Sequence, residues 1–232
     1  MRKKRKLIAF LVLILLSALA VAAYFLLPEL IEREEEKNFF KEYYDAKVVE
    51  FGEENKKLSN VDVAFIGDSI TDGYEAFGSA YSEYTVAWRG IGGDTTFGLF
   101  DRLDVSLYAV NPKVVVLLIG INNIDSMFEN YESIIADIRE KLPKASLIVQ
   151  SLHPTSGDFA DRNGRILSAN RRILELSSKY GFTYVDVHSA LVDENTGEYS
   201  SVYTDDGLHP NSKGYEKITE TLFPVIESKI SK

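Results

Sequence analysis

The segment KVVVLLIG, residues 113–120, restricts the fold of this chain more than any other part of the sequence. It is an unbroken apolar run, too short for an ordinary helix and rich in β-branched valine, which is typical of a strand buried on both faces. The segments VDVAFIG (61–67) and SLIVQSL (146–152) have the same character. Strands of this kind belong mainly to parallel sheets that helices cover on both sides. The sequence therefore predicts an α/β fold.

Helical patterns alternate with these strands. In residues 97–110 we expect Phe97, Phe100, Leu103 and Leu107 to share an inward face, and residues 131–142 have a clear amphipathic pattern. Further helices are expected over 162–181, ended by Gly181, and over 211–230, with weaker strands over 85–93 and 182–187. The alternation predicts a three-layer, flavodoxin-like sandwich with a five-stranded parallel sheet, formed by residues 60–232.

The N-terminal part has a different composition. MRKKRK carries five positive charges, and it precedes 21 residues without a charge, Leu7–Leu27, which as a helix would span roughly 30 Å. Residues 1–28 are therefore interpreted as a cytoplasmic basic segment and a transmembrane helix, with a cleaved signal peptide as the alternative. Residues 29–59 are expected to form a charged juxtamembrane helix or linker. Either interpretation places the domain outside the cytoplasm.

Composition excludes several classes of function. The net charge of −9 gives a nucleic-acid partner no electrostatic support. The chain has no cysteine, which excludes disulfides, a thiolate nucleophile and cysteine-ligated zinc. Its three histidines do not occur in any short-spaced metal motif, so we expect no metal site.

Polar residues follow the predicted strands, where the carboxyl ends of a parallel sheet gather ligands. Ser69 follows the first strand, Asn122 the third, and a late loop carries Asp206 and His209 three residues apart. A serine hydroxyl becomes a nucleophile when an imidazole takes its proton, and a carboxylate can orient that imidazole. Asp205 is an alternative acid. Ser69 could instead cap a helix, because serine favours that position.

Four short motifs carry a family resemblance: GDSIT, RGIGGDTT, GINN and DGLHP, in this order. Over roughly residues 60–225 the chain resembles the SGNH hydrolases, also called the GDSL esterase/lipase family. GIGGDTTFGLFDRL followed by PKVVVLLIGINN is most similar to the catalytic subunits of platelet-activating-factor acetylhydrolase.

The resemblance implies a role for each residue of the proposed site. Ser69 would be the nucleophile, His209 the general base and Asp206 the acid that orients it. The oxyanion hole would consist of the backbone N–H groups of Ser69 and Gly93 and the side chain of Asn122.

Three more residues are candidates for a substrate pocket: Asn123, His153 and Trp88. Asn123 stands where the family more often has aspartate. His153 follows the fourth predicted strand, and Trp88 lies on the second.

The resulting expectation is an extracytoplasmic, membrane-anchored serine esterase that needs no cofactor. It would hydrolyse short-acyl esters, above all O-acetyl esters of carbohydrate or lipid, through an acyl-serine intermediate. One alternative is an acyltransferase that uses the same triad with a glycan acceptor. The other is a binding domain that has the SGNH hydrolase fold but no catalytic activity.

Overall fold

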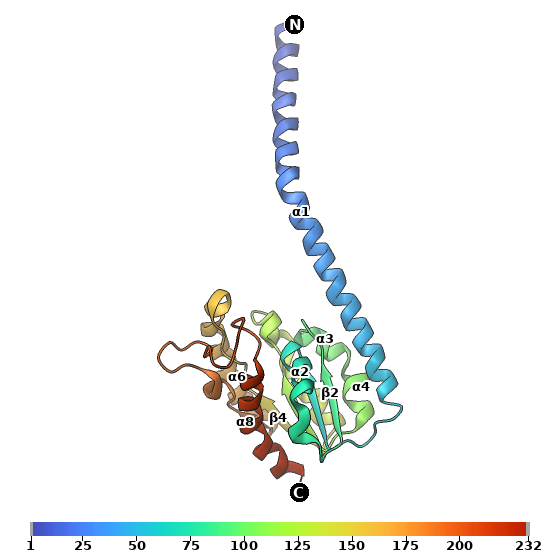
Figure 1. Cartoon of the computed structure of the whole chain (residues 1–232). Coiled ribbons are helices and arrows are strands. Elements are labelled where there is room, and N and C mark those ends of the chain that lie inside the picture. The colour runs from blue at the N-terminus through green and yellow to red at the C-terminus, as the bar shows by residue number, and fades with distance from the viewer. Residues whose placement is uncertain (1, 231–232) are drawn as a thin grey trace. The chain divides into compact units, whose positions relative to one another are not determined.

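The computed structural model describes residues 2–230, with the side chains of Lys4, Tyr24, Leu26, Leu27 and every residue from Leu30 onward. The chain divides into two units, Met1–Tyr43 and Tyr44–Lys232. Helix α1 (Arg2–Glu54) makes up the described part of the first unit, and its last residues belong to the second (Figure 1).

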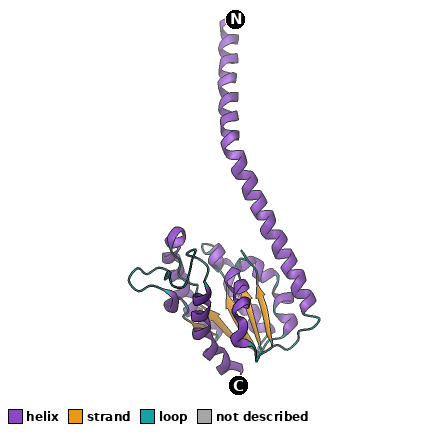
Figure 2. Ribbon diagram, in the orientation of Figure 1, coloured by secondary structure: helices purple, strands orange, loops and turns teal. Residues whose placement is uncertain are grey.

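The second unit is built on one parallel sheet of five strands in the order β2-β1-β3-β4-β5 (Figure 2). This confirms the predicted five-stranded sheet and its flavodoxin-like order. The strand at the centre, β3, is at most 2% exposed along its whole length, as the apolar run predicted. The strands are β1 (Val63–Gly67), β2 (Val86–Gly90), β3 (Val114–Leu118), β4 (Ser146–Gln150) and β5 (Thr183–Val185).

Helices cover both faces of this sheet. Helices α2 and α8 pack together, since the ring of Tyr215 stacks on that of Tyr74 at 5.6 Å and its hydroxyl donates to the Ile70 carbonyl. On the other face α5 contacts α3 and α6, the arrangement that right-handed crossovers produce in a doubly wound sheet. The helices are α2 (Ser69–Tyr74), α3 (Thr96–Asp101), α4 (Leu103–Ser106), α5 (Tyr131–Lys141), α6 (Asn163–Tyr180), α7 (His188–Leu191) and α8 (Ser212–Ile230).

The amphipathic pattern predicted for residues 131–142 is confirmed, because its apolar residues are buried: Tyr131, Ile134, Ile135, Ile138 and Leu142. The inward face predicted for residues 97–110 is right for Leu103 and Leu107 and wrong for Phe97 and Phe100. Phe97 and Phe100 are 42% and 39% exposed, whereas Leu99, Leu103 and Leu107 are buried. The segment is not one helix, because it breaks at Arg102 between α3 and α4. Leu99, Leu103 and Leu107 are spaced four apart, so the buried face passes through Leu99 and leaves Phe97 and Phe100 on its flanks.

The last turns of α1 are part of the domain. Phe51 is 1% exposed, and the guanidinium of Arg89 on strand β2 lies 4.7 Å from its ring centroid. The compact unit therefore begins at Tyr44, earlier than residue 60, where the sequence analysis places the start of the domain.

Among the residues that the structure describes, we find no helix that combines the length and apolar character needed to cross a membrane. The predicted transmembrane helix over Leu7–Leu27 falls largely on residues whose side chains lie outside this description. The structure therefore does not support that prediction.

Candidate active site

The site begins where strand β1 passes into helix α2. Asp68 is the N-cap of α2, because its carboxylate accepts a hydrogen bond of 3.1 Å from the backbone N–H of Ile70. Ser69 is the first residue of the helix, one position later. The capping role considered for Ser69 is thus filled by its neighbour.

The hydroxyl of Ser69 faces the late loop that carries His209. Ser69 Oγ lies 3.1 Å from His209 Nε2, and His209 Nδ1 lies 2.7 Å from Asp206 Oδ2. Ser69 and His209 are 140 positions apart in the sequence, so only the fold brings them together. The three side chains lie in the serine–imidazole–carboxylate arrangement that can support nucleophilic catalysis.

The environment of Asp206 keeps it ionised. Burial raises the pKa of this carboxyl, but the hydrogen bonds from the His209 ring and from the backbone N–H groups of His209 and Leu208 outweigh it and lower the pKa to about 2. The competing acid, Asp205, instead accepts from the side chain of Asn211 at 3.1 Å. The geometry therefore selects Asp206 as the partner of His209.

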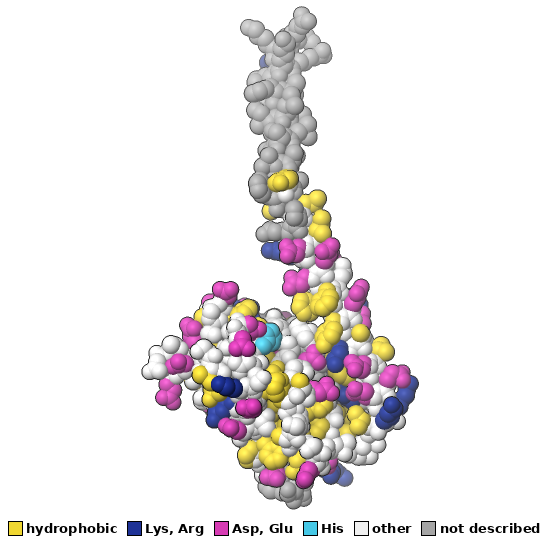
Figure 3. Space-filling model, viewed as in Figure 1, with side chains coloured by type: hydrophobic (Ala, Val, Ile, Leu, Met, Phe, Trp, Pro, Cys, Tyr) yellow, Lys and Arg dark blue, Asp and Glu magenta, His cyan; other side chains and the backbone are white. Residues whose placement is uncertain are grey.

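Neighbouring hydrogen bonds hold the loop that carries His209. The Thr204 hydroxyl donates to the His209 carbonyl at 2.7 Å and accepts from the Gly207 N–H at 3.0 Å. Gly207 in turn accepts from the Ser156 N–H at 2.9 Å, which joins this loop to the segment after strand β4. The imidazole itself is half-exposed, and a histidine side chain reaches the surface beside acidic groups in Figure 3.

The turn after strand β2 provides one candidate oxyanion donor. The Asp94 N–H donates to the Ile91 carbonyl at 3.1 Å, and Gly93 between them has a φ of +76°. This is the geometry of a type II turn, which favours glycine at the third position. In this turn, the orientation of the peptide that joins Gly92 to Gly93 sets the direction of the Gly93 N–H.

Asn122 lies in the short helix Ile121–Asn123 that follows strand β3. One N–H of its amide donates to the Asp94 carbonyl at 2.9 Å, which ties Asn122 to the glycine turn. A side-chain amide has two N–H groups, so this bond orients the amide and leaves a second donor for a substrate oxygen.

A buried ion pair between Arg102 and Asp94, which was not predicted from the sequence, holds the last residue of the Ile91–Asp94 turn. Arg102 Nε lies 2.8 Å from Asp94 Oδ2, and the same guanidinium donates to the backbone carbonyls of Gly67 and Arg89 at the ends of strands β1 and β2. Both side chains of the pair are almost completely buried. The sequence carries no local signal for this pair, because two of the acceptors of Arg102 lie 13 and 35 residues away.

The three residues considered for a substrate pocket have different surroundings. Asn123 accepts from the Thr96 N–H and donates to the Thr96 hydroxyl, so its side chain holds the start of α3. Trp88 stacks on Phe65 at 4.6 Å in an aromatic cluster. His153 is only 3% exposed, and neither ring nitrogen has a hydrogen-bond partner. The structure therefore does not support a substrate contact for Trp88 or His153.

A surface hollow of about 510 Å³ lies beside Asn122. Asn123 is also on its wall, together with residues of the turn after it and of the short helix Gly157–Arg162. Arg165 forms ion pairs of 2.9 Å with Asp125 and with Asp161 there, and the guanidinium of Arg162 lies 4.8 Å from the ring centroid of Phe159. The hollow thus combines charged, planar hydrogen-bonding groups with one aromatic ring next to the candidate oxyanion hole.

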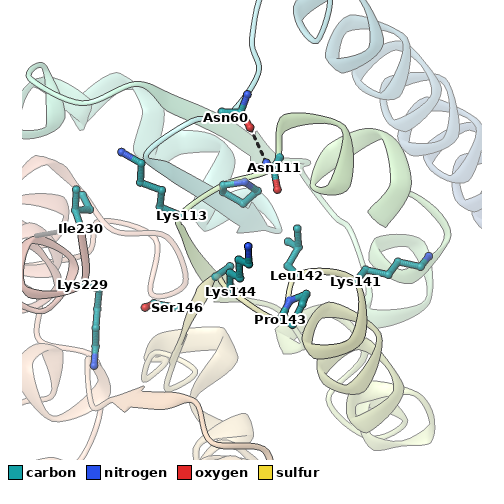
Figure 4. Close-up of a pocket in the computed structure, with 12 residues that line it drawn as sticks. Asn60, Asn111, Lys113, Lys141, Leu142, Pro143, Lys144, Ser146, Lys229 and Ile230 are labelled. Atoms are coloured by element: carbon teal, nitrogen blue, oxygen red, sulfur yellow. Dashed lines mark hydrogen bonds between the residues drawn. The ribbon is translucent and has the colours of Figure 1, made fainter. Parts of the chain in front are cut away.

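A second hollow, of about 490 Å³, lies at the opposite edge of the sheet, near the first residues of strands β3 and β4 (Figure 4). Four lysines contribute to its wall, but the amino groups of Lys113, Lys141 and Lys229 point apart in Figure 4. None of the candidate catalytic or oxyanion-hole residues lines it. Elsewhere too, no cluster of three or more histidine, aspartate or glutamate side chains within the described chain could hold a metal ion.

The model of the GDSL-like lipase/acylhydrolase family matches residues 65–217, which include Ser69, Gly93, Asn122, Asp206 and His209. The chain belongs to this family. The GDSL family resemblance inferred from the four motifs is thereby confirmed.

Two proteins named for platelet-activating factor are similar to this chain over most of their own length. A platelet-activating factor acetylhydrolase IB subunit beta homolog of Drosophila melanogaster is 29% identical over 178 residues, which is 71% of this chain and 77% of that protein. A solved Streptococcus pneumoniae structure, named for platelet activating factor, has a TM-score of 0.76 at 26% identity and covers 84% of this chain and 98% of its own.

Two further relatives are much longer than the matched region. A multidomain esterase of Ruminococcus flavefaciens is 26% identical over 66% of this chain, and an acetylxylan esterase of Xylanibacter ruminicola is 24% identical over 74% of it. The chain spans only 21% and 44% of the length of these two proteins.

Proposed function

We propose that the protein is a serine carboxylic ester hydrolase that removes short acyl groups, above all acetyl, from an ester of carbohydrate or lipid. The observation that carries this proposal is the alignment of Ser69 Oγ, the His209 ring and the Asp206 carboxylate, at 3.1 and 2.7 Å. Membership of the GDSL-like lipase/acylhydrolase family supports the proposal. Two of the relatives are named for the removal of acetyl groups, one as an acetylxylan esterase and one as an acetylhydrolase subunit homolog.

In the acylation half of this mechanism, Ser69 Oγ attacks the ester carbonyl while its proton moves to His209 Nε2. The N–H groups of Ser69 and Gly93 and the second N–H of the Asn122 amide stabilise the oxyanion. When the tetrahedral intermediate collapses, the alcohol leaves with the proton from His209, and the acyl group remains on Ser69.

In the deacylation half, His209 takes a proton from water, and the resulting hydroxide attacks the acyl carbonyl. The second tetrahedral intermediate releases a carboxylic acid, and the proton on His209 returns to Ser69 Oγ. Asp206 stabilises the imidazolium in both halves because it stays ionised. Each proton has a donor and an acceptor among these residues, the substrate and water, so the mechanism invokes no cofactor.

The hollow beside Asn122 supports a glycan as the alcohol part of the substrate. Its volume, about 510 Å³, is in the usual range for small-molecule sites. Carboxylates and guanidinium groups held in ion pairs can bond to sugar hydroxyls in fixed directions, and the Phe159 ring offers an apolar surface. The hollow has three aspartates and two arginines on its wall, so an anionic lipid headgroup would meet excess negative charge.

A comparison of two esters tests both parts of the proposal. The full chain is assayed with p-nitrophenyl acetate and with an acetylated xylo-oligosaccharide, alongside Ser69→Ala. Loss of both activities in Ser69→Ala would support Ser69 as the nucleophile. Equal rates of hydrolysis by Ser69→Ala and the unaltered chain would refute that role. Transfer of the acyl group to an added glycan, instead of water, would favour the acyltransferase alternative.

The hollow is tested by Phe159→Ala and Arg165→Ala, with Arg171→Ala as the control on the same helix as Arg165. Arg171 is exposed and bonds only weakly to Ser168, at 3.4 Å. We expect the ratio of kcat/KM for the glycan ester to that for p-nitrophenyl acetate to fall about tenfold or more in the two hollow variants. An unchanged ratio in both hollow variants would exclude the hollow as a glycan site. A kcat/KM of the unaltered chain that is higher for a lysophospholipid than for the glycan ester would contradict a glycan substrate.

Location outside the cytoplasm remains a proposal from the sequence. The charge-free segment Leu7–Leu27 and the five preceding basic charges support an N-terminal anchor with the domain outside. Protease treatment of intact cells would digest the domain if this orientation is right and leave it intact if it is wrong.

A further inference from the structure

The glycine turn that presents the Gly93 N–H has little stiffness of its own. Gly92 and Gly93 are adjacent, and glycine adopts positive and negative φ with nearly equal ease. Rotation of the peptide between them would turn the Gly93 N–H away from the oxyanion. The orientation of this donor therefore depends on hydrogen bonds that the rest of the domain makes to the turn.

One such bond comes from helix α2. The carboxylate of Asp72 accepts from the Gly92 N–H at 3.2 Å through Oδ2. Gly90, just before the turn, lies so close that a Cβ there would come within 2.0 Å of the Asp72 backbone nitrogen. Asp72 thus touches the turn through its side chain and the residue before the turn through its backbone.

The end of helix α1 holds Asp72 from the other side. The Lys47 ammonium lies 3.5 Å from Asp72 Oδ1, and the Lys47 side chain is only 17% exposed. Screening by solvent is weaker for such a partly buried pair than for a surface pair. Lys47 also contacts its own helix, since its ammonium lies 3.3 Å from Glu50 Oε2 and 5.4 Å from the ring centroid of the buried Phe51.

The same helix also contacts the far side of the turn. The Tyr44 hydroxyl donates to the Gly98 carbonyl in α3 at 2.8 Å. Gly98 packs against Asp94, since a Cβ on it would lie 2.2 Å from Asp94 Oδ1 and 3.3 Å from the Tyr44 ring. Tyr44 and Lys47 therefore contact the neighbours of the Ile91–Asp94 turn from both sides.

We propose that Asp72, oriented by Lys47 at the end of α1, is a positioning residue that holds the Ile91–Asp94 turn with the Gly93 N–H directed at the oxyanion. The effect on catalysis rests on the proposed esterase function. The claim that Asp72 and Lys47 hold the turn rests on the contacts alone. It gives the last turns of α1 a role in catalysis, although none of their side chains belongs to the triad.

The first test measures turnover in the full chain with p-nitrophenyl acetate. Asp72→Ala removes the acceptor for Gly92, so kcat is expected to fall about 10- to 100-fold with KM nearly unchanged, because the donor acts mainly in the transition state. Asp72→Asn retains an acceptor oxygen and should recover most of the loss. Lys47→Met keeps the alkyl chain and should lower kcat about three- to tenfold.

Lys57→Met is the matched control, since Lys57 is exposed and lies beyond the end of α1. It should retain the kcat of the unaltered protein. A wild-type kcat in Asp72→Ala, or a rise in KM at constant kcat, would overturn the proposal.

The second test does not depend on activity, so it separates this inference from the proposed function. The backbone amide resonances of ¹⁵N-glycine-labelled protein are compared between the unaltered chain and Asp72→Ala. The Gly92 and Gly93 resonances should shift or broaden, while those of Gly181 and Gly197, in distant turns, stay in place. Unmoved Gly92 and Gly93 resonances would overturn the inference whether or not the protein is an esterase.

Discussion

Asp68 caps helix α2 with its carboxylate, and this leaves the hydroxyl of the next residue, Ser69, to face His209. A cap of this kind stabilises a helix by about 1 kcal/mol. It also fixes the first turn of α2, and therefore the direction of the Ser69 N–H, one of the candidate oxyanion donors. Capping and catalysis are thus divided between two adjacent residues.

Asp68 should make the stability of the protein fall as pH rises toward neutrality. Burial raises the pKa of its carboxyl from 3.8 to about 7. Between these pH values the folded state holds a proton that the unfolded state releases, so stability is lost as pH increases, by up to about 1.4 kcal/mol per pH unit. Asp68→Asn keeps an acceptor for Ile70 and cannot ionise.

Urea denaturation of both proteins between pH 5 and pH 8 measures this effect. The free energy of unfolding of the variant, relative to the unaltered protein, should increase with pH and level off above pH 7. A difference that does not vary with pH would contradict a raised pKa for Asp68.

His153 should have the opposite pH dependence. Burial, together with the nearby His188, lowers its pKa from 6.5 to about 3. As pH falls below 6.5 the unfolded state takes up a proton that the folded state does not, so stability is lost, by about 2 kcal/mol between pH 6.5 and pH 5. In His153→Gln the free energy of unfolding, measured by urea denaturation, should fall less between pH 6.5 and pH 5 than in the unaltered protein. An equal fall in both proteins would contradict a lowered pKa for His153.

Replacement of Asp206 should disable the general base without unfolding the domain. In Asp206→Asn the amide cannot stabilise the imidazolium and can favour the wrong tautomer of His209, so the acylation rate should fall about 10³- to 10⁴-fold. The burst of p-nitrophenolate in stopped flow measures acylation directly. Asp205→Asn, which alters only the contact with Asn211, serves as the control. Full activity in Asp206→Asn would show that Asp206 is not the carboxylate that orients His209.

Loss of the Asn122 amide should lower turnover by about 100-fold or more, because one oxyanion donor disappears. Asn122→Asp has almost the same shape but no N–H, so it should be as impaired as Asn122→Ala. Steady-state kinetics on p-nitrophenyl acetate separate the effect on kcat from that on KM. Normal turnover in Asn122→Asp would remove this side chain from the oxyanion hole.

The features that could be predicted from the sequence were those encoded in local patterns. Apolar runs such as 113–120 gave the strands, and the motifs at their ends placed Ser69, Asn122 and His209 at one edge of the sheet. The three-residue spacing of Asp206 and His209 gave the correct pair, because a short turn is enough to join them.

The features that could not be predicted depend on long-range packing. The buried guanidinium of Arg102 bonds to carbonyls 13 and 35 residues away, and an isolated arginine in a helical pattern looks like a solvent-exposed residue. The contact of Lys47 with Asp72 likewise joins two elements that have no common sequence pattern. In residues 97–110 the fold buries Leu99 and leaves Phe97 and Phe100 partly exposed, a choice that depends on the neighbouring elements and not on the local pattern.

The most direct test of the account is covalent labelling of the full chain with diethyl p-nitrophenyl phosphate, followed by mass analysis of the tryptic peptides. An activated serine displaces p-nitrophenolate and keeps the diethylphosphoryl group. The account predicts that the label is on Ser69, that activity is lost in proportion to labelling, and that His209→Ala slows the reaction about 100-fold or more. A label on another residue, or lost activity with Ser69 unmodified, would contradict it.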